Sequence, residues 1–101
     1  MNKAVIYYVL NALSETTSDA WNITESYKKR GFCRIFYEST YASICLLQLG
    51  REEEYYLVPI SSNNRLVLNH VHRIDLFDHQ SVMKTLKQVT KTSNKIRKQS
   101  A

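Results

Sequence analysis

The sequence predicts an α+β protein with two N-terminal helices, a small antiparallel meander of three to four strands and a basic C-terminal helix. Apolar residues run almost continuously through 3–14, as in a buried element. From Phe32 they alternate with polar residues, and after Asp78 they recur at spacings of three and four. A chain of 101 residues fits one domain. We expect a globular body over 1–91 and a basic, frayed tail over 92–101.

The first two elements are predicted as helices. The length of the apolar run and its Leu10-Asn11-Ala12-Leu13 end favour a helix over 3–14. Ser18 is expected to cap a second helix that buries Ala20, Ile23 and Tyr27. Lys28, Lys29 and Arg30 would then lie in its last turn, and Gly31 would end it in the left-handed conformation.

The middle of the chain is predicted to form the meander. Strands are expected over 33–38, 41–49, 55–60 and 65–77. Residues 50–54 should form a hairpin loop, and the polar run 61–64 a turn. In the last strand His70 and His72 would share one face with Leu66, Leu68, Ile74 and Leu76.

The last element is predicted as a helix capped by Asp78, with an apolar side formed by Val82, Met83, Leu86 and Val89. Its other side carries a basic ridge, which we define as Lys84, Lys87, Lys91, Lys95 and Lys98. Beyond Thr92 only Ile96 continues the apolar side, so the final residues are expected to fray unless they are bound.

Charge is divided unevenly along the chain. Residues 1–82 contain eight basic and nine acidic side chains, whereas residues 83–101 contain six basic ones, Arg97 among them, and no acid. The basic helix can be a solvated surface, a phosphate-binding strip for DNA or RNA, or a docking segment for an acidic protein groove. Residues 84–101 contain no aromatic side chain, which argues against base stacking by this helix.

The sequence gives little sign of catalysis. With only Gly31 and Gly50, no glycine-rich phosphate loop can form, and no motif places a nucleophile beside a base. His70 and His72, followed by Asp75, Asp78 and His79, could supply metal ligands, but no second cluster completes a site. Exposed polar positions on a sheet are the favoured interpretation. We therefore predict a protein that is not an enzyme and that needs no cofactor or metal.

Several other residues are candidates for partner contact. Trp21, Tyr55 and Tyr56 belong to the residue types that anchor protein interfaces, although aromatic residues also fill small cores. The run Glu52–Glu54 could meet a basic partner, but a solvated hairpin tip is favoured. Pro59 would suit an edge strand or the point where the chain leaves a strand, and an exposed Val58–Pro59 bond could dock a prolyl isomerase. The candidate partner-binding set is Lys84, Lys87, Lys91, Lys95, Arg97, Lys98, Trp21, Tyr55 and Tyr56.

Cysteine usage and hydropathy bear on the compartment. Cys33 and Cys45 fit no disulfide framework or zinc motif, so we interpret them as buried free thiols. The apolar run near the N-terminus is too short for a membrane span and lacks the cleavage site of a signal peptide. We expect a cytoplasmic protein that does not contact a membrane.

Two segments carry a family resemblance: AVIYYVLNALSETTSDAWNITESYKKRGFCRIFYESTYASICLLQLG and EEEYYLVPISSNNRLVLNHVHRIDLFD. In these segments the chain resembles the small anti-RecBCD accessory proteins encoded by lambdoid phages of Salmonella. The likeness rests on overall sequence and size, since no short motif anchors it. It implies a phage protein in the cytoplasm of the bacterial host that binds the RecBCD helicase-nuclease through RecC. Such a protein would change the output of RecBCD so that phage recombination proteins gain the DNA ends, and the family offers no catalytic residues to carry over.

Overall fold

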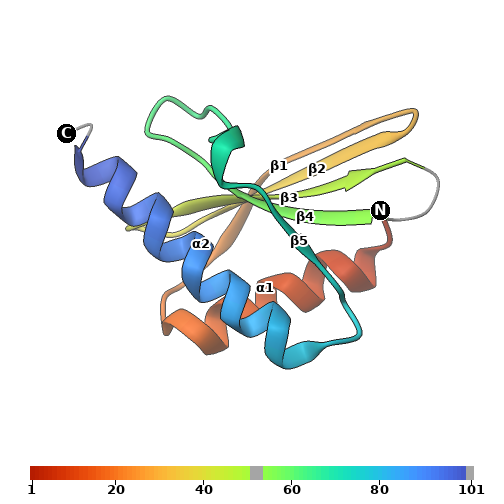
Figure 1. Ribbon diagram of the computed structural model, residues 1–101, viewed down its shortest axis with the longest axis horizontal. Coiled ribbons are helices and arrows are strands. Elements are labelled where there is room, and N and C mark those ends of the chain that lie inside the picture. Colours follow the sequence, from red (N-terminus) through yellow and green to blue (C-terminus); the bar gives the residue numbers. More distant parts are fainter. Residues whose placement is uncertain (51–53, 100–101) are drawn as a thin grey trace.

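Two helices cover one face of a five-stranded antiparallel sheet in the computed structural model, which describes residues 1–50 and 54–99 (Figure 1). The elements are α1 (Lys3–Thr17), β1 (Asn22–Lys29), β2 (Phe32–Glu38), β3 (Ser43–Leu49), β4 (Glu54–Pro59), the 3-10 turn η1 (Leu68–His70), β5 (His72–Ile74) and α2 (His79–Gln99). Neighbouring strands follow one another in chain order, as in a meander. The α+β class and the C-terminal helix are confirmed, while the numbers of helices and strands differ from those predicted.

Helix α1 begins where the Asn2 side chain accepts a hydrogen bond from the Ala4 N–H at 2.8 Å. It buries Val9, Ala12 and Leu13 against the sheet and α2. It ends at Ser18, which adopts the left-handed conformation (φ 59°) and donates its N–H to the Ser14 carbonyl at 3.2 Å. Ser18 therefore closes the first helix and does not begin a second one.

The predicted second helix is wrong, because its residues form β1 and the turn that follows it. Ile23, Thr24 and Tyr27 suit an extended chain, and β1 pairs with β2 from Asn22 opposite Glu38 to Lys29 opposite Phe32. Gly31 does take a left-handed φ of 76°, but in the β1–β2 hairpin and not at a helix end. The main-chain groups of these residues therefore form hydrogen bonds with β2 and not within a helix.

Strands β2, β3 and β4 form the centre of the sheet, close to the predicted ranges. Their side chains alternate between the face covered by the helices and an outer face. The helix-covered face supplies the main core, which includes Ile35, Tyr37, Ile44, Leu46 and Leu57. The outer face has its own smaller cluster, made by Phe36, Cys45, Leu47, Val58 and Ile60.

The strand predicted over 65–77 is also wrong. After the turn at 61–64, where Asn64 is left-handed (φ 59°), only a bridge between Ile60 and Leu66 continues the pairing before η1. The short strand β5 then pairs with β4. His70 ends η1 and His72 begins β5, so these two histidines do not share one face of a strand. Glu52 and Glu53 of the acidic run lie outside the described residues.

Helix α2 crosses the sheet over β3, β4 and β5 and packs on α1 (Figure 1). As predicted, Asp78 caps it, because the carboxylate accepts a hydrogen bond from the Ser81 N–H at 3.1 Å. The helix continues through the boundary expected at residue 92 and reaches Gln99, and Ser93 beyond that boundary is fully buried. The expected division between a body and a tail therefore falls inside one helix.

Candidate interaction surfaces

The basic ridge lies on the side of α2 that faces away from the sheet. Val82, Leu86, Val89 and Ser93 are buried, whereas all five lysines of the ridge are exposed. The ridge is about 21 Å long, at 1.5 Å of rise per residue. Within residues 1–50 and 54–99 none of its lysines forms an ion pair. Arg97 differs from them, because it is half-buried and donates a hydrogen bond to the Ser43 hydroxyl at 3.4 Å.

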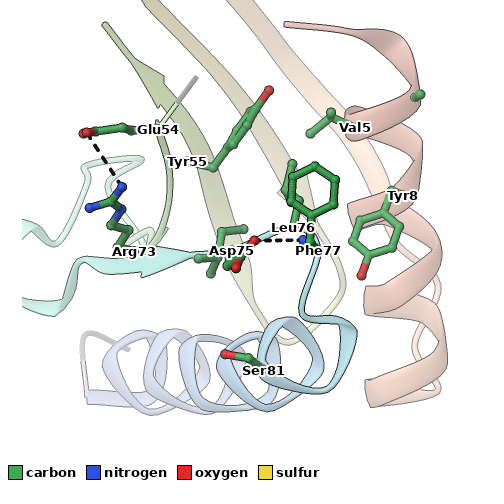
Figure 2. Close-up of a pocket in the computed structure, with 11 residues that line it drawn as sticks. Val5, Tyr8, Glu54, Tyr55, Arg73, Asp75, Leu76, Phe77 and Ser81 are labelled. Atoms are coloured by element: carbon green, nitrogen blue, oxygen red, sulfur yellow. Dashed lines mark hydrogen bonds and ion pairs between the residues drawn. The ribbon is translucent and has the colours of Figure 1, made fainter. Parts of the chain in front are cut away.

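A groove with a volume of about 830 Å³ lies between the first half of α1, the β4–β5 edge and the segment leading into α2 (Figure 2). Its apolar lining includes Val5 and Tyr8 from α1 and Leu76 and Phe77 from the β5–α2 connection. Figure 2 shows the Phe77 ring beside Leu76, and it shows Val5 and Tyr8 projecting toward this ring from α1. The groove therefore offers an apolar concave surface between two elements that are far apart in the sequence.

Phe77 is the most unusual side chain of the groove, because it is 100% exposed. It directly precedes the cap residue Asp78, at the position where an apolar side chain commonly packs against the fourth residue of the helix. That fourth residue, Val82, is buried elsewhere in the core. Phe77 is therefore not buried by its own chain. Burying a phenylalanine side chain would contribute about 1.5 to 3 kcal/mol of favourable free energy.

Local hydrogen bonds hold Phe77 in this position. Its N–H donates to the Asp75 carboxylate at 3.0 Å (Figure 2). The Asp78 N–H donates to the Asp75 carbonyl at 3.1 Å. At the β4–β5 edge of the groove, Arg73 and Glu54, which also line it, form an exposed ion pair at 3.8 Å. The aromatic side chain is therefore presented from an ordered turn.

Tyr8 connects α1 to the start of α2. Its hydroxyl lies 2.7 Å from Nδ1 of His79, and the two rings meet edge to face. Partial burial raises the pKa of Tyr8, and the carboxylates of Glu15 and Asp78 raise it further. The phenol therefore stays neutral at physiological pH and acts as a hydrogen-bond partner that fixes one wall of the groove.

The aromatic residues predicted as interface anchors lie mostly inside the protein. Trp21 is 6% exposed, and its indole N–H donates to the Thr17 hydroxyl at 2.7 Å. Tyr55 belongs to the main core. Tyr56 lies half-buried on the outer face, and its hydroxyl donates to Glu54 at 2.7 Å, a bond that raises the pKa of the phenol. Trp21 and Tyr55 are therefore core residues, and Tyr56 alone of the three borders solvent.

Pro59 is buried at the end of β4, where its carbonyl accepts a hydrogen bond from the Val67 N–H at 2.9 Å. Docking of a prolyl isomerase requires an exposed bond, which this position does not offer in the folded chain. The candidate metal ligands are scattered as well. In the parts of the chain that the structure describes, no three histidine, cysteine, aspartate or glutamate residues gather closely enough to hold a metal ion.

Sequence reasoning missed the groove and the outer side of β1. Val5, Tyr8 and Phe77 come from the two ends of the chain, so no local pattern joins them. A signal for Phe77 was nevertheless present, because a phenylalanine between two turn-forming aspartates and next to a helix cap has no obvious place in a strand. Tyr27 was assigned to the buried side of a helix, but it is 43% exposed on a strand.

Comparison with known proteins identifies no matching family, no matching curated protein and no matching solved structure. Of the two helices formed by the described residues, neither is long and apolar enough to cross a membrane.

Proposed function

We propose that this protein is a non-enzymatic modulator that works by binding a larger protein through the groove and Phe77. The observation that carries the proposal is the full exposure of Phe77 on an ordered turn beside an apolar groove of about 830 Å³. Buried aromatic anchors dominate the energy of protein interfaces. An exposed phenylalanine side chain contributes favourable binding free energy when a partner protein provides a pocket that buries it.

The family resemblance of the sequence supports a specific partner. On that basis the protein binds the RecBCD helicase-nuclease in the cytoplasm of the bacterial host, through RecC, and redirects its activity toward phage recombination. The phage recombination proteins, which are possible further partners of this chain, would then gain access to the DNA ends. This role requires binding and no chemistry, and at the groove the Tyr8 hydroxyl and the Asp75 carboxylate are engaged in local hydrogen bonds.

The basic ridge extends this surface. Ser81 lines the groove, and Lys84, the first lysine of the ridge, follows one turn later on α2. A partner seated on Phe77 can therefore also meet the ridge, and a carboxylate-rich surface is its natural counterpart. Contacts of this kind speed association and select the partner more than they add affinity.

The test is a binding measurement between purified RecBCD and variants of the protein. Phe77→Ala should weaken binding by about 30-fold or more, as expected for an interface anchor worth 2 kcal/mol or more. Leu68→Ala is the matched control, because Leu68 is 68% exposed and lies in η1, away from the groove. Since Phe77 is fully exposed, its replacement should leave the circular dichroism spectrum and the unfolding midpoint unchanged.

Equal binding by the two variants would remove Phe77 from the interface. Failure of the unmodified protein to bind RecBCD would reject the partner named by the resemblance. A RecBCD activity that stays the same when the complex forms would reject the role of modulator.

The alternative function is binding of DNA or RNA through the basic ridge. It is supported by the exposed lysines and by the absence of any acidic residue between His79 and Gln99. Affinity for duplex DNA would then fall with salt, with a logarithmic slope of about 0.9 for each phosphate neutralised. Binding that is insensitive to salt, or no binding to DNA at all, would exclude this alternative.

A further inference from the structure

The outer face of the sheet carries a row of two tyrosines, two arginines and a central leucine that crosses all five strands. The strand register places Tyr27 opposite Arg34, Arg34 opposite Leu47, Leu47 opposite Tyr56, and Tyr56 opposite Arg73. We call these five residues the outer row. At the usual spacing of neighbouring strands it is about 19 Å long. Both helices lie on the other face of the sheet (Figure 1).

The two ends of the outer row are open to solvent. Tyr27 is 43% exposed, Tyr56 is half-buried, and the Arg73 side chain is 68% exposed. In the adjacent row, Phe32 is half-buried and Leu49 is 37% exposed. The covered part of the outer face includes Leu47 at the middle of the row and continues along the strands at Phe36, Cys45 and Val58. The end of the sheet near the β1–β2 hairpin is therefore an accessible surface of aromatic and aliphatic groups.

Contacts within the surface hold Tyr27 and Arg34 in place. The Arg34 guanidinium lies 5.0 Å from the centre of the Tyr27 ring and 5.3 Å from that of Phe36. It also forms an ion pair with Glu25 at 2.8 Å. Tyr27 meets Phe32 edge to face, with 6.2 Å between the ring centres. A ligand that stacks here meets rings whose positions are already fixed, so little side-chain entropy is lost on binding.

The surface is positively charged at its margin. Among the described residues, the carboxylates of Glu25 and Glu54 at this surface are both paired with arginines of the outer row. Lys29 projects from the same face, because it lies opposite Phe32 in the register. Arg30 follows it in the hairpin turn, and both side chains are exposed, whereas Lys28, opposite Cys33, projects from the helix-covered face. In the part of the chain that the structure describes, Lys29 and Arg30 therefore place unpaired positive charge beside the exposed Tyr27 ring, one face of which the Arg34 guanidinium covers.

We propose that this outer face binds single-stranded nucleic acid, with bases stacking on Tyr27 and Tyr56 and phosphates meeting the basic residues Lys29 and Arg30 beside the β1–β2 turn. Ring faces accept any base, and a basic margin can follow the phosphate backbone, which together are the two requirements of single-strand binding. A duplex keeps its bases stacked inside, so it can use only the charges. The surface lies across the sheet from α2, so this activity is independent of the basic ridge and goes beyond the proposed binding of RecBCD.

The experiment is fluorescence anisotropy with a labelled oligothymidylate of about 16 nucleotides, a length within the site size of single-strand binding domains. The unmodified protein should bind the single strand more tightly than a duplex of the same length. Tyr27→Leu should weaken binding by about 5- to 150-fold, the range that stacking of one base on an aromatic side chain implies. Tyr27→Phe keeps the ring and should bind as the unmodified protein does.

A pair of charge variants separates the two basic surfaces. Replacing Lys29 and Arg30 together by Glu should abolish binding of the oligothymidylate, whereas the same change at Lys84 and Lys87 should leave it intact. All four side chains are exposed, so neither variant disturbs the core. For the unmodified protein, the logarithm of affinity should fall with that of salt by about 0.7 per phosphate contacted.

Four results would overturn the proposal. They are no binding of oligothymidylate at low salt, equal binding by Tyr27→Leu and Tyr27→Phe, equal affinity for single strand and duplex, and loss of binding in the ridge variant alone. Sedimentation provides a further test. A dimer that dissociates in Tyr27→Leu but not in Tyr27→Phe would make the outer face a contact between two copies, which also rejects the proposal.

Discussion

Ser93 in the second half of α2 accepts a hydrogen bond at 2.9 Å from the main-chain N–H of Ser43 at the start of β3. The same hydroxyl donates to the Ile60 carbonyl at 3.2 Å, just beyond the end of β4. Ser93 is 0% exposed, so water cannot replace either bond. One small polar side chain thus joins the C-terminal half of the basic helix to the ends of two central strands.

Ser93→Ala should lower the free energy of unfolding by about 1 to 3 kcal/mol, because it leaves buried main-chain groups without their partner. Urea unfolding followed by circular dichroism measures the change. Ser81→Ala is the control in the same helix, because Ser81 is exposed and its replacement should change stability by no more than about 0.5 kcal/mol. Equal stability of the two variants would show that α2 does not depend on this contact.

Gly31→Ala should destabilise the protein by about 1 to 2 kcal/mol, because residue 31 has a φ of 76° that L-residues with a Cβ avoid. A Cβ at this position would meet nothing within 4 Å, so the loss comes from the backbone conformation alone. Gly31→Asn should lose less, since asparagine tolerates the left-handed region. Thermal unfolding of the two variants measures this difference in stability. If the alanine variant were as stable as the asparagine variant, residue 31 would not have a left-handed conformation in the hairpin.

Cys45 should make stability depend on pH in alkaline solution. Burial raises the pKa of its thiol from 9.0 to about 12. Above pH 9.0 the unfolded chain releases this proton while the folded chain retains it, so the folded state loses stability as pH rises toward 12. The free-energy difference between the unmodified protein and Cys45→Ala should therefore shrink over that window in urea titrations.

Val58→Ala is the control for this effect, because Val58 lies opposite Cys45, is equally buried and does not titrate. Its destabilisation should stay constant over the same pH range. A constant difference for Cys45→Ala as well would mean that the thiol is not held in its neutral form by the fold.

Replacing Lys84, Lys87 and Lys91 together by Glu should weaken binding of RecBCD far more than any single replacement. Each isolated surface pair contributes only about 0.2 to 1 kcal/mol, whereas reversing three neighbouring charges adds repulsion along the whole ridge. Titration calorimetry with purified RecBCD measures the effect. Replacement of Lys28, Lys29 and Arg30 by Glu changes the charge equally on another surface and should leave RecBCD binding intact. If the ridge variant binds normally, the docking surface lies elsewhere.

Local patterns were sufficient for several elements. The Asp78 cap, the apolar side of Val82, Leu86 and Val89, and the exposed lysines are all where the periodicity of the last segment predicts them. The alternation of residues in β2 and β3 likewise predicts strands. In these segments the preference of each residue and the burial pattern agree, so no contact from a distant part of the chain had to decide the outcome.

Residues 18–30 show where local patterns fail. A helix ending at Gly31 and a strand followed by a hairpin turn both need a left-handed residue there, so the glycine is compatible with both. Pairing with β2 decides between the two, because it provides hydrogen-bond partners for the main-chain groups of Asn22–Lys29. This matters for the proposed outer surface. Tyr27, predicted on the buried side of a helix, instead lies exposed on a strand beside Arg34.

The sequence by itself determined the mixed α+β character, the polarised charge and the basic ridge, since these follow from composition and from spacing along one segment. Only the tertiary structure decided which aromatic residues are available to a partner. It buried Trp21 and Tyr55 and exposed Phe77 and Tyr27. The physical reason is that an aromatic side chain is equally suited to a core and to an interface. Which of the two occurs depends on the neighbours that strand pairing and helix packing bring from distant parts of the chain.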